Sequence, residues 1–187
     1  MSPPGPGSDK SAAWRTSNAP GPRENTENAW PLVAALERRE IWDDLVGVDA
    51  LATIRIECPP FKPVKEYGRD AYLNRMYDTR TDLGNTPERA GAGAKYCGRG
   101  FIQITGRANY ERYGKLLGVD LVQTPDCALE PAIAAEIFAA YFQTRKVHWA
   151  AYKRDWLRVC KLVNGGYRAP PEFLDLVENL EAELARA

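Results

Sequence analysis

The sequence predicts a mainly α-helical fold, with helices packed on helices and at most a small β-hairpin. Three observations lead to this prediction. From Glu27 onward, apolar residues recur every three to four positions, as they do on the buried face of a helix. One short segment, residues 101–105 (FIQIT), alternates apolar and polar side chains between glycines, which suits a short strand or an extended turn. The length of 187 residues suffices for one domain with its own hydrophobic core.

The N-terminal residues 1–24 differ in composition from the rest of the chain. They are rich in Pro, Gly, Ser and Asn, and such a segment cannot bury enough apolar surface to offset the entropy lost on ordering. We therefore expect a flexible tail or linker over residues 1–24, which could join another module, and one folded domain over residues 25–187.

Prolines mark the start of the first expected helix and the end of the second. Pro31 suits the first turn of a helix that begins after Glu27, because a helix leaves its first N–H groups without an internal partner. The second helix is expected to run from about Asp49 and to stop at the prolines at positions 59 and 60. Proline disfavours helical geometry in the residue before it, so Glu57 should lie in or near the last turn.

The remaining elements follow from the same spacing rules. Residues 79–100 are dense in turn-forming residues and predict a loop. Aromatic and apolar residues from Trp149 to Val163 form one stripe, which we interpret as core packing. Further helices are expected over residues 69–77, 107–117, 131–146, 150–163 and 171–185.

Composition and charge argue against several classes of protein. The formal net charge is zero, with 25 basic and 25 acidic residues, so neither a nucleic-acid-binding protein nor a strongly cationic membrane-attacking protein is expected. The sequence contains no run of about eighteen apolar residues, the length that a membrane span needs, so stable membrane insertion is not expected. The N-terminus lacks the apolar stretch of a secretory signal peptide, which predicts a protein that stays in the cytoplasm or is released by other means.

The cysteines and the single histidine do not indicate a metal site. Cys58, Cys97, Cys127 and Cys160 are widely spaced and form no CxxC pair, and His148 is the only histidine. We expect reduced, partly buried thiols that act as small apolar residues; the alternative is a disulfide formed after export. His148 is expected at the surface or at the core edge, and no metal or other cofactor is expected.

Two glutamates nine positions apart, Glu57 and Glu66, are candidates for a catalytic pair. Inverting glycosidases use one protonated and one ionised carboxyl group roughly 6.5–9.5 Å apart. Apolar neighbours such as Ile56 would desolvate Glu57 and raise its pKa, whereas Lys65 and Arg69 would keep Glu66 ionised.

The segment KYCGRGFIQITGRANY, residues 95–110, gathers polar groups near glycines. Its glycines let the backbone pass close to other groups, and Gln103 and Thr105 would fall on one side of an extended segment. Asn109 follows just beyond the turn. Amide and hydroxyl groups beside two carboxylates suit sugar binding and the positioning of water. The alternative is a glycine-rich structural turn whose polar side chains satisfy local backbone groups.

The block YCGRGFIQITGRANY, with the earlier ECPPF and LGNT and the later LVNGGY, resembles the family 19 glycoside hydrolases. The likeness covers roughly residues 28–180. It is greater to the lysozyme-like endolysins of bacteriophages than to the plant chitinases, which carry extra loops around the cleft. The resemblance implies a lysozyme-like α-helical fold and an inverting mechanism, with no metal or nucleotide required.

The resemblance also implies roles for individual residues. Glu57 is the expected general acid, Glu66 the base that activates water, and Thr105 the hydroxyl that helps to hold this water. The residues expected to contact the sugar or to line the cleft are Tyr96, Gln103, Asn109 and Asn164. Where the family often has His-Glu-Ser or His-Glu-Thr, this chain has Ile56-Glu57-Cys58, which would remove a hydrogen-bonding neighbour of the acid.

Several assignments stay open at this point. Asp82 and Glu88, in the loop after the third helix, are alternatives to Glu66 as the base. Arg99 and Arg107 could meet acidic parts of a substrate, or they could be solvated or form salt bridges.

We therefore expect a peptidoglycan hydrolase of the endolysin type, which cleaves glycosidic bonds of the cell-wall glycan. The alternatives are a chitinase and a non-catalytic wall-binding or virion module with the same fold. Such an enzyme would wait in the host cytoplasm until a separate lysis protein opens the membrane, and it could be one module of a larger lysin.

Overall fold

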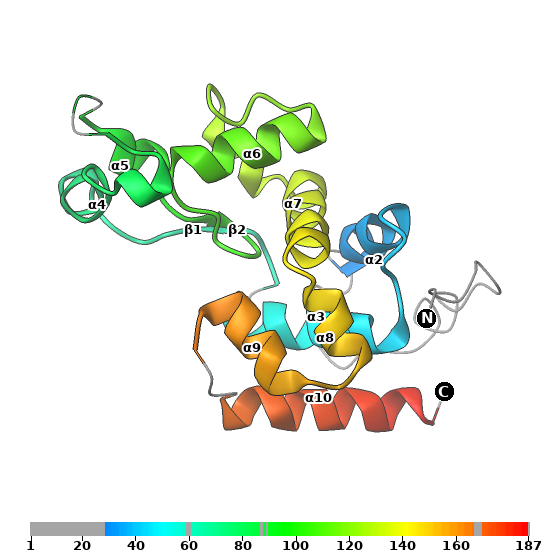
Figure 1. The fold of residues 1–187 in the computed structure, drawn as a ribbon. Helices are drawn as coiled ribbons and strands as arrows, with labels where there is room; N and C mark the ends of the chain where they lie inside the picture. Colours follow the sequence, from blue (N-terminus) through cyan, green and yellow to red (C-terminus); the bar gives the residue numbers. More distant parts are fainter. Residues whose placement is uncertain (1–28, 59–60, 87, 89, 167–169, 187) are drawn as a thin grey trace.

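The computed structural model describes residues 29–58, 61–86, 88, 90–166 and 170–186, most of which are helical (Figure 1). In chain order, the elements are α2 (Ala29–Arg38), α3 (Asp44–Glu57), β1 (Val64–Lys65), α4 (Asp70–Tyr77), η2 (Thr81–Leu83), α5 (Ala92–Lys95), β2 (Arg99–Gly100), α6 (Arg107–Leu117), η3 (Pro125–Leu129), α7 (Pro131–Thr144), α8 (Val147–Tyr152), α9 (Trp156–Asn164) and α10 (Pro171–Leu184). The predicted fold class is confirmed. The tail predicted over residues 1–24 lies outside the described residues.

The helices form two lobes that share α7 (Figure 1). In the larger lobe α3 packs along α10, and α2, α8 and α9 complete its core. The smaller lobe contains α4, α5, α6 and η3. Helix α7 is apolar around most of its circumference because it serves both cores. Phe138 and Phe142 stack in the larger core, with ring centroids 4.2 Å apart, while Ile137 and Ala140 pack in the smaller core.

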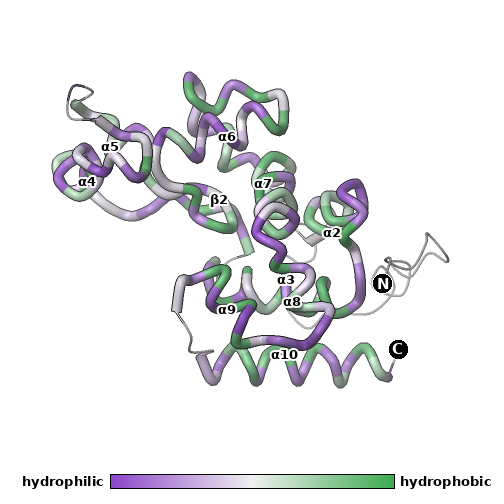
Figure 2. Tube along the Cα trace, viewed as in Figure 1, coloured by the Kyte–Doolittle hydropathy of each residue, from purple (hydrophilic) through white to green (hydrophobic). Residues whose placement is uncertain are grey.

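The outer helices bury one face only. Along α10, hydrophobic and hydrophilic residues alternate around the helix (Figure 2), and the buried positions are Phe173, Val177 and Leu180. This spacing of three to four residues is that of an amphipathic helix at a protein surface. None of the described helices is long and apolar enough to cross a membrane.

Helix α3 begins five residues earlier than predicted, at Asp44 rather than Asp49. Asp43 caps the helix, because its carboxylate accepts a hydrogen bond from the Leu45 N–H at 2.9 Å. The predicted start was wrong because this cap, and not the apolar spacing, sets the first turn. The predicted end is correct, and Glu57 is the last residue of the helix. The predicted bounds of α4, α6, α7 and α10 agree with the structure to within two residues.

The helix predicted over residues 150–163 is two helices, α8 and α9. Between them Arg154 has a φ of 54°, a left-handed backbone conformation, and Asp155 caps α9 with its side chain. The stripe that we interpreted as core packing is therefore divided. Its α9 residues pack in the larger core, but Trp149 and Tyr152 on α8 are 41% and 47% exposed.

Residues 101–105, predicted as a short strand or an extended turn, form a tight turn after β2. Strand β2 pairs antiparallel with β1 in a two-stranded sheet, the small amount of β-structure that the predicted fold class allowed. The chain then reverses, because Gly100 and Gln103 have positive φ values of 96° and 49°, and Ile104 returns to pair with Arg99. Two left-handed residues so close together end the extended conformation, so of the two alternatives predicted for this segment the strand is wrong and the segment is a turn.

The β1–β2 ribbon lies between the lobes. Val64 and Phe101 pack in or against the larger core, Ile104 belongs to the smaller core, and Ile102 contacts both. Side chains carried by this ribbon are therefore held where the two lobes meet.

All four cysteines are free thiols. Cys58, Cys97 and Cys160 are buried, and Cys127 is partly buried. Burial raises the pKa of the Cys58 and Cys160 thiols to about 11, so both stay protonated near neutral pH. They pack as small apolar residues.

Asp49, in the middle of α3, makes stability dependent on pH. It is fully buried, and burial raises its pKa well above its ordinary value of 3.8. A carboxyl group whose pKa is raised by folding contributes its full stability below the unfolded-state pKa and loses it as the pH rises towards the folded-state pKa. We expect Asp49→Asn to remove this decline, measured by urea unfolding from about pH 4 to about pH 8. Asp175→Asn, at an exposed position on α10, is the control, and the same pH dependence in Asp49→Asn and wild type would contradict the expectation.

Candidate active site

Glu57 stands at the end of α3, at the edge of a pocket between α3 and α9. The pocket is lined by Thr53, Ile56, Glu57, Val159, Cys160, Val163, Asn164, Pro170 and Phe173. Burial raises the pKa of the Glu57 carboxyl, and a hydrogen bond with the Asn164 side chain opposes part of this rise. A half-buried carboxyl group with a raised pKa keeps its proton closer to neutral pH, which a general acid requires.

The end of α9 directs Asn164 at Glu57. Gly165 ends this helix in a left-handed conformation with a φ of 76°. Tyr141 on α7 donates its hydroxyl proton to the Leu162 carbonyl at 2.8 Å, which fixes the same end of α9. The family resemblance assigned Asn164 to the sugar, and in the structure its side chain bonds to the candidate acid itself.

The Cys58 thiol joins the end of α3 to the β1–β2 ribbon. It is fully buried, and its Sγ atom donates to the carbonyl oxygens of Gly100 and Phe101, each at 3.6 Å. We expected a cysteine next to the acid to remove a hydrogen-bonding neighbour. The thiol still donates, and its partner is the ribbon. This contact places Glu57, the preceding residue, beside the ribbon.

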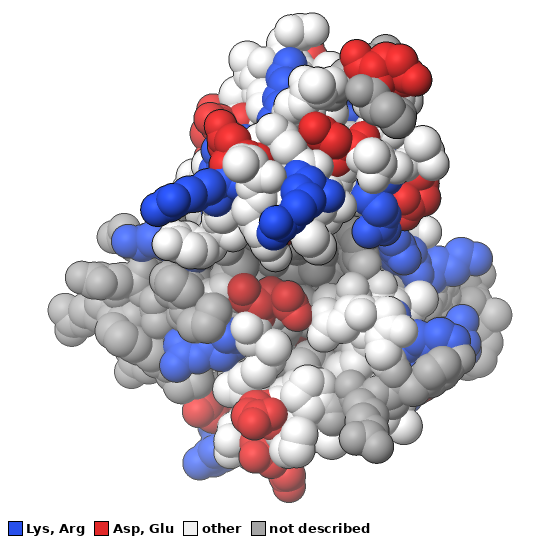
Figure 3. Space-filling model, turned by 90° about the vertical axis from the view of Figure 1, so that its left-hand side faces the viewer, with Lys and Arg blue, Asp and Glu red and all other residues white. Residues whose placement is uncertain are grey.

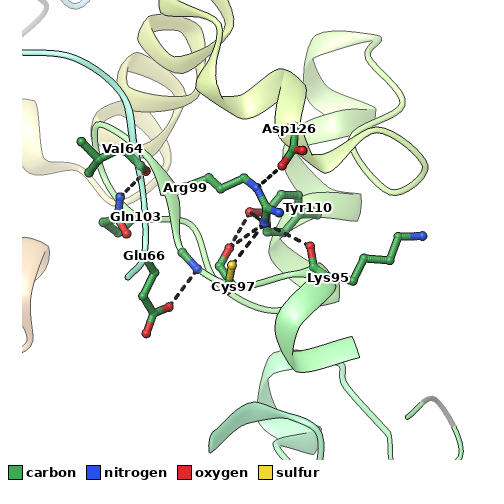
Figure 4. A network of polar contacts seen from close by, with 9 residues as sticks. Val64, Glu66, Lys95, Cys97, Arg99, Gln103, Tyr110 and Asp126 are labelled. Carbon is green, nitrogen blue, oxygen red and sulfur yellow. Dashed lines mark hydrogen bonds and ion pairs between the residues drawn. The ribbon is translucent and has the colours of Figure 1, made fainter. Parts of the chain in front are cut away.

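Glu66 directly follows β1, and two donors of the smaller lobe hold its carboxylate. The Tyr77 hydroxyl donates to Oε1 at 2.8 Å. The Gly98 N–H donates to Oε2 at 3.0 Å (Figure 4). The predicted partners Lys65 and Arg69 are not the donors. Burial and the contact with Glu66 raise the pKa of Tyr77 to about 12, so its hydroxyl stays protonated and remains a donor.

Three predicted site residues converge on Gly98. A Cβ atom built there would lie 2.5 Å from an amide oxygen, 3.2 Å from a carboxylate oxygen and 3.3 Å from a hydroxyl oxygen. These atoms are Gln103 Oε1, Glu66 Oε2 and Thr105 Oγ1. The grouping of these residues was predicted, but the predicted cause was wrong. The tight turn after β2, and not an extended segment, brings Gln103 and Thr105 together.

The Gln103 amide braces the ribbon. Its Nε2 donates to the Val64 carbonyl at 2.8 Å and to the Gly100 carbonyl at 3.1 Å, which joins β1 to β2 (Figure 4). With the donors of this amide committed to the backbone, its oxygen is left beside the Glu66 carboxylate as an acceptor.

Two residues that were assigned to the sugar or the cleft make contacts inside the smaller lobe. Asn109 donates from Nδ2 to the Thr105 carbonyl at 2.7 Å, which ties the turn to the first turn of α6. Tyr96 is 5% exposed, packs against Tyr110 with ring centroids 5.5 Å apart, and donates its hydroxyl to the Val122 carbonyl. The expectation that Tyr96 lines a cleft is therefore wrong, because its ring and its hydroxyl are both used inside the core.

Arg99 belongs to the structure of the smaller lobe and is 2% exposed (Figure 4). Its guanidinium group donates to Asp126 at 2.7 Å, to the Lys95 and Cys97 carbonyls at 3.0 and 3.1 Å, and to the Tyr110 hydroxyl at 2.9 Å. Of the two roles left open from the sequence, the salt-bridged one is correct for this residue.

We expect Arg99→Met to lower the free energy of unfolding by about 3 kcal/mol, because it leaves buried acceptors without a donor. Urea unfolding measures this change. The matched control is Arg107→Met. Arg107 forms a partly exposed pair with Glu111 one helical turn away, at 3.1 Å, and its loss should cost about 0.5 kcal/mol or less. Equal losses in the two variants would contradict the structural role of Arg99.

Asn85, from the LGNT block, is fully buried and was not predicted as a site residue. Its Nδ2 donates to the Tyr77 carbonyl at 2.9 Å, and its Oδ1 accepts from the Arg107 N–H at 3.1 Å. It joins the end of α4 to the start of α6 and so positions Tyr77, the donor to Glu66. In the sequence, the one sign of this role is an asparagine directly after a glycine in the LGNT block. The two hydrogen-bond partners of Asn85 lie 8 and 22 positions away along the chain, so a local motif does not reveal them.

The alternative titratable residues have other surroundings. Asp82 is exposed and forms a two-point ion pair with Arg80, which lowers the pKa of Asp82. Glu88 is also exposed. His148 is half-buried, with Nδ1 2.9 Å from the Phe142 carbonyl, and burial lowers the pKa of its ring. It lies at the core edge, as predicted.

The two glutamates thus belong to different lobes. Glu57 belongs to the larger lobe, Glu66 is held by groups of the smaller lobe, and the β1–β2 ribbon lies between the lobes. Figure 3 shows a hollow where the lobes meet, with acidic side chains at its lower edge and basic side chains along its upper edge. A carboxyl group with a raised pKa in one lobe and a carboxylate that accepts two hydrogen bonds in the other suit acid–base chemistry.

Comparison with known proteins supports the family resemblance. The family model described as chitinase class I matches residues 74–154. Over 134 residues, the chain is 37% identical to a glycosyl hydrolase family 19 domain-containing protein of Haemophilus influenzae. The chain belongs to glycoside hydrolase family 19. That match covers 68% of this family 19 chain and 62% of the relative, so the chain spans less than two thirds of the length of that curated relative.

Other members of family 19 match over shorter segments or in fold alone. A basic endochitinase of Vitis vinifera is 47% identical over 51 residues, which are 27% of this chain and 16% of that protein. The crystal structure of chitinase C from Streptomyces griseus superposes with a TM-score of 0.61 and 20% identity, covering 94% of this chain and 74% of that one. A second bacterial family 19 chitinase gives a TM-score of 0.61 and 19% identity, covering 93% and 91%.

Gly98→Ala tests whether the convergence on Gly98 matters for activity. We expect the added methyl group to displace the Gln103 amide and the Glu66 carboxylate, since a gap of 2.5 Å cannot hold it. Activity should fall at least about 100-fold, because small displacements of catalytic groups are costly. Stability should fall by about 1–3 kcal/mol. Turnover and urea unfolding measure the two effects, and a folded Gly98→Ala protein with wild-type turnover would contradict the prediction.

The control for the stability effect is Gly166→Ala. A Cβ atom at Gly166 would meet nothing within 4 Å. Its free energy of unfolding should stay within about 0.5 kcal/mol of the wild type.

Proposed function

We propose that this family 19 protein is a glycoside hydrolase that cleaves the glycan strand of peptidoglycan by inversion. Glu57 acts as general acid, Glu66 acts as general base, and Thr105 helps to hold the attacking water. The single observation that carries the proposal is the contrast between the two glutamates at the β1–β2 ribbon. Glu57 is half-buried with a raised pKa, and Glu66 accepts two hydrogen bonds from groups of the smaller lobe.

The proposed reaction is a single displacement. The Glu57 carboxylic acid gives its proton to the glycosidic oxygen as the bond from this oxygen to the anomeric carbon breaks. A water on the opposite face of the sugar attacks the same carbon and gives a proton to Glu66. The products are a sugar with inverted anomeric configuration and a free hydroxyl on the leaving sugar. Glu57 then regains a proton from solvent, and Glu66 releases one.

Thr105 and Gln103 suit the task of holding the water. The Thr105 hydroxyl and the Gln103 amide oxygen both lie near the Glu66 carboxylate around Gly98. A water bound beside these groups would find an acceptor for each of its two protons. Loss of one proton to Glu66 would leave the attacking oxygen oriented by the remaining contacts.

The choice of peptidoglycan rests on the resemblance of the sequence to the endolysins, which have shorter spacing between their motifs than the plant chitinases with their extra loops. The bacterial relative matches over 134 residues, whereas the Vitis vinifera endochitinase and Chitinase 8 of Oryza sativa match over 51 and 47 residues. In the wider proposal, the protein is an endolysin that stays in the host cytoplasm until a lysis protein opens the membrane, and it can be one module of a larger lysin.

Purified peptidoglycan and chitin oligomers, digested side by side, test the proposed substrate. Mass analysis of the released reducing ends should show cleavage of peptidoglycan and identify the linkage. Glu57→Gln, inactive in the proposed mechanism, controls for contaminating hydrolases. Turnover of chitin alone would reverse the choice of substrate.

A chitinase is the second candidate, because the named relatives and solved structures are chitinases. It would share the fold and the mechanism. A non-catalytic wall-binding or virion module is the third candidate, and Ile56 and Cys58, which depart from the family pattern beside the acid, are the observation behind it. Binding to the wall without release of any reducing end by the wild-type protein would support that third candidate.

A further inference from the structure

Behind Glu57, α3 carries a line of polar side chains into the core of the larger lobe. Asp49, Thr53 and Glu57 are spaced four residues apart and therefore share one face of the helix. Thr53 and Glu57 both line the pocket between α3 and α9, and Asp49 lies deeper and is fully buried. Burying a polar group costs free energy unless it forms a hydrogen bond, so we asked which hydrogen bonds these three side chains form.

The hydrogen bonds along this line have a direction. The Thr53 hydroxyl donates to Asp49 Oδ1 at 3.1 Å. A hydroxyl has one proton, so on its other side the Thr53 oxygen can only accept. Asp49 Oδ2 has no hydrogen-bond partner among the described residues. Burial raises the pKa of Asp49, so the apolar surroundings favour the neutral form of its carboxyl group.

The pocket can connect Thr53 to Glu57. It has room for about one water molecule, and Thr53, Glu57 and Asn164 supply polar groups to a lining that is otherwise mostly apolar. A water there can accept the proton of the Glu57 carboxylic acid and donate one of its own to Thr53. In this series of hydrogen bonds, every donor points from Glu57 towards Asp49. The series therefore stabilises the protonated form of Glu57 and offers no donor to its ionised form. Asn164, which bonds to Glu57 from α9, acts in the opposite direction.

We propose that Asp49 and Thr53 are positioning residues that keep Glu57 protonated through a water in this pocket. The catalytic meaning of this inference rests on the proposed function, in which Glu57 is the general acid. Three other titratable groups interact electrostatically with Glu57 or Asp49. They are Cys58, directly after α3, Cys160 on α9 and Tyr141 on α7. The buried residues of α8 and α10 are apolar.

Two matched pairs of variants test the inference in the full chain. Asp49→Leu removes the acceptor for Thr53 and frees its hydroxyl to point at the pocket, whereas Asp49→Asn keeps an acceptor oxygen. Thr53→Ala removes the hydroxyl, whereas Thr53→Ser keeps it. The readout is the titration of the Glu57 carboxyl by carbon-13 NMR, with the resonance assigned from its loss in Glu57→Gln.

We expect Asp49→Leu and Thr53→Ala to lower the Glu57 titration midpoint by roughly half to one pH unit. Asp49→Asn and Thr53→Ser should keep the wild-type midpoint. The alkaline limb of kcat/KM should move with the NMR midpoint in each variant. If Asp49→Leu does not fold, the pair at Thr53 decides alone.

A merely structural role would change the free energy of unfolding and leave the Glu57 midpoint in place. Unchanged or raised midpoints in the folded Leu and Ala variants would overturn the inference. The NMR titration needs no substrate. A wild-type protein without turnover would therefore contradict the proposed function while the inference about Glu57 is still decided.

Discussion

Replacing Glu57 by glutamine is expected to abolish hydrolysis while binding of the wall polymer persists. Glutamine has nearly the same shape, so the pocket between α3 and α9 should stay filled. Its amide cannot give a proton to the glycosidic oxygen, and loss of a general acid typically costs about 10²- to 10⁴-fold in rate. The Asn164 side chain, which bonds to Glu57 in the wild type, can turn to meet the new amide. The measurements are kcat on purified peptidoglycan and co-sedimentation with the same polymer.

The matched control is Glu178→Gln on α10. It makes the same chemical change at an exposed position of the same lobe and should keep wild-type kcat. Wild-type activity in Glu57→Gln would remove Glu57 from the mechanism. Loss of both activity and binding would mean that Glu57 holds the polymer, and the assignment as general acid would then lose its support.

Replacing Glu66 by glutamine is expected to reduce kcat by several orders of magnitude, for two reasons. An amide cannot take a proton from the attacking water. In addition, the Tyr77 hydroxyl and the Gly98 N–H both donate to this carboxylate in the wild type. An amide presents one oxygen and one NH₂ group, so one of these donors would face another donor. We therefore expect a measurable loss of stability in Glu66→Gln, with kcat and urea unfolding as the two readouts.

Three companion variants separate Glu66 from its rivals. Tyr77→Phe removes one donor and keeps the carboxylate, so its loss of kcat should be smaller than that of Glu66→Gln. Asp82→Asn and Glu88→Gln make a similar change at the two loop carboxylates and should stay close to wild type. An active Glu66→Gln together with an inactive Glu88→Gln would show that the base was assigned to the wrong residue.

The helices of this fold could largely be predicted from the spacing of apolar residues. The errors arose where a single residue outweighs that spacing. Asp43 starts α3 earlier than its apolar pattern does, and Arg154 divides one expected helix into two. The alternation in FIQIT resembles a strand, but Gly100 and Gln103 adopt left-handed conformations that end it. Backbone conformations of this kind depend on contacts with the rest of the fold, which the spacing of side chains does not report.

The candidate site was only partly predictable for a similar reason. Glu66, Gln103 and Thr105 converge because they belong to a short ribbon and its turn, so a local motif could indicate them. Tyr77 and Asn85 hold this group through bonds that join separate elements, and no local spacing records such bonds. Tyr96 shows the converse difficulty. An aromatic residue beside a polar motif can serve a cleft or a core, and only its buried position decides.

The anomeric configuration of the first product tests the two-carboxylate mechanism most directly. Proton NMR would follow the wild-type protein as it cleaves a soluble peptidoglycan fragment, before the new reducing end equilibrates in solution. The proposed mechanism, in which Glu57 gives the proton and Glu66 activates a water, predicts a product with inverted configuration, and no product from Glu57→Gln. A product with retained configuration, or equal product from Glu57→Gln, would contradict the mechanism.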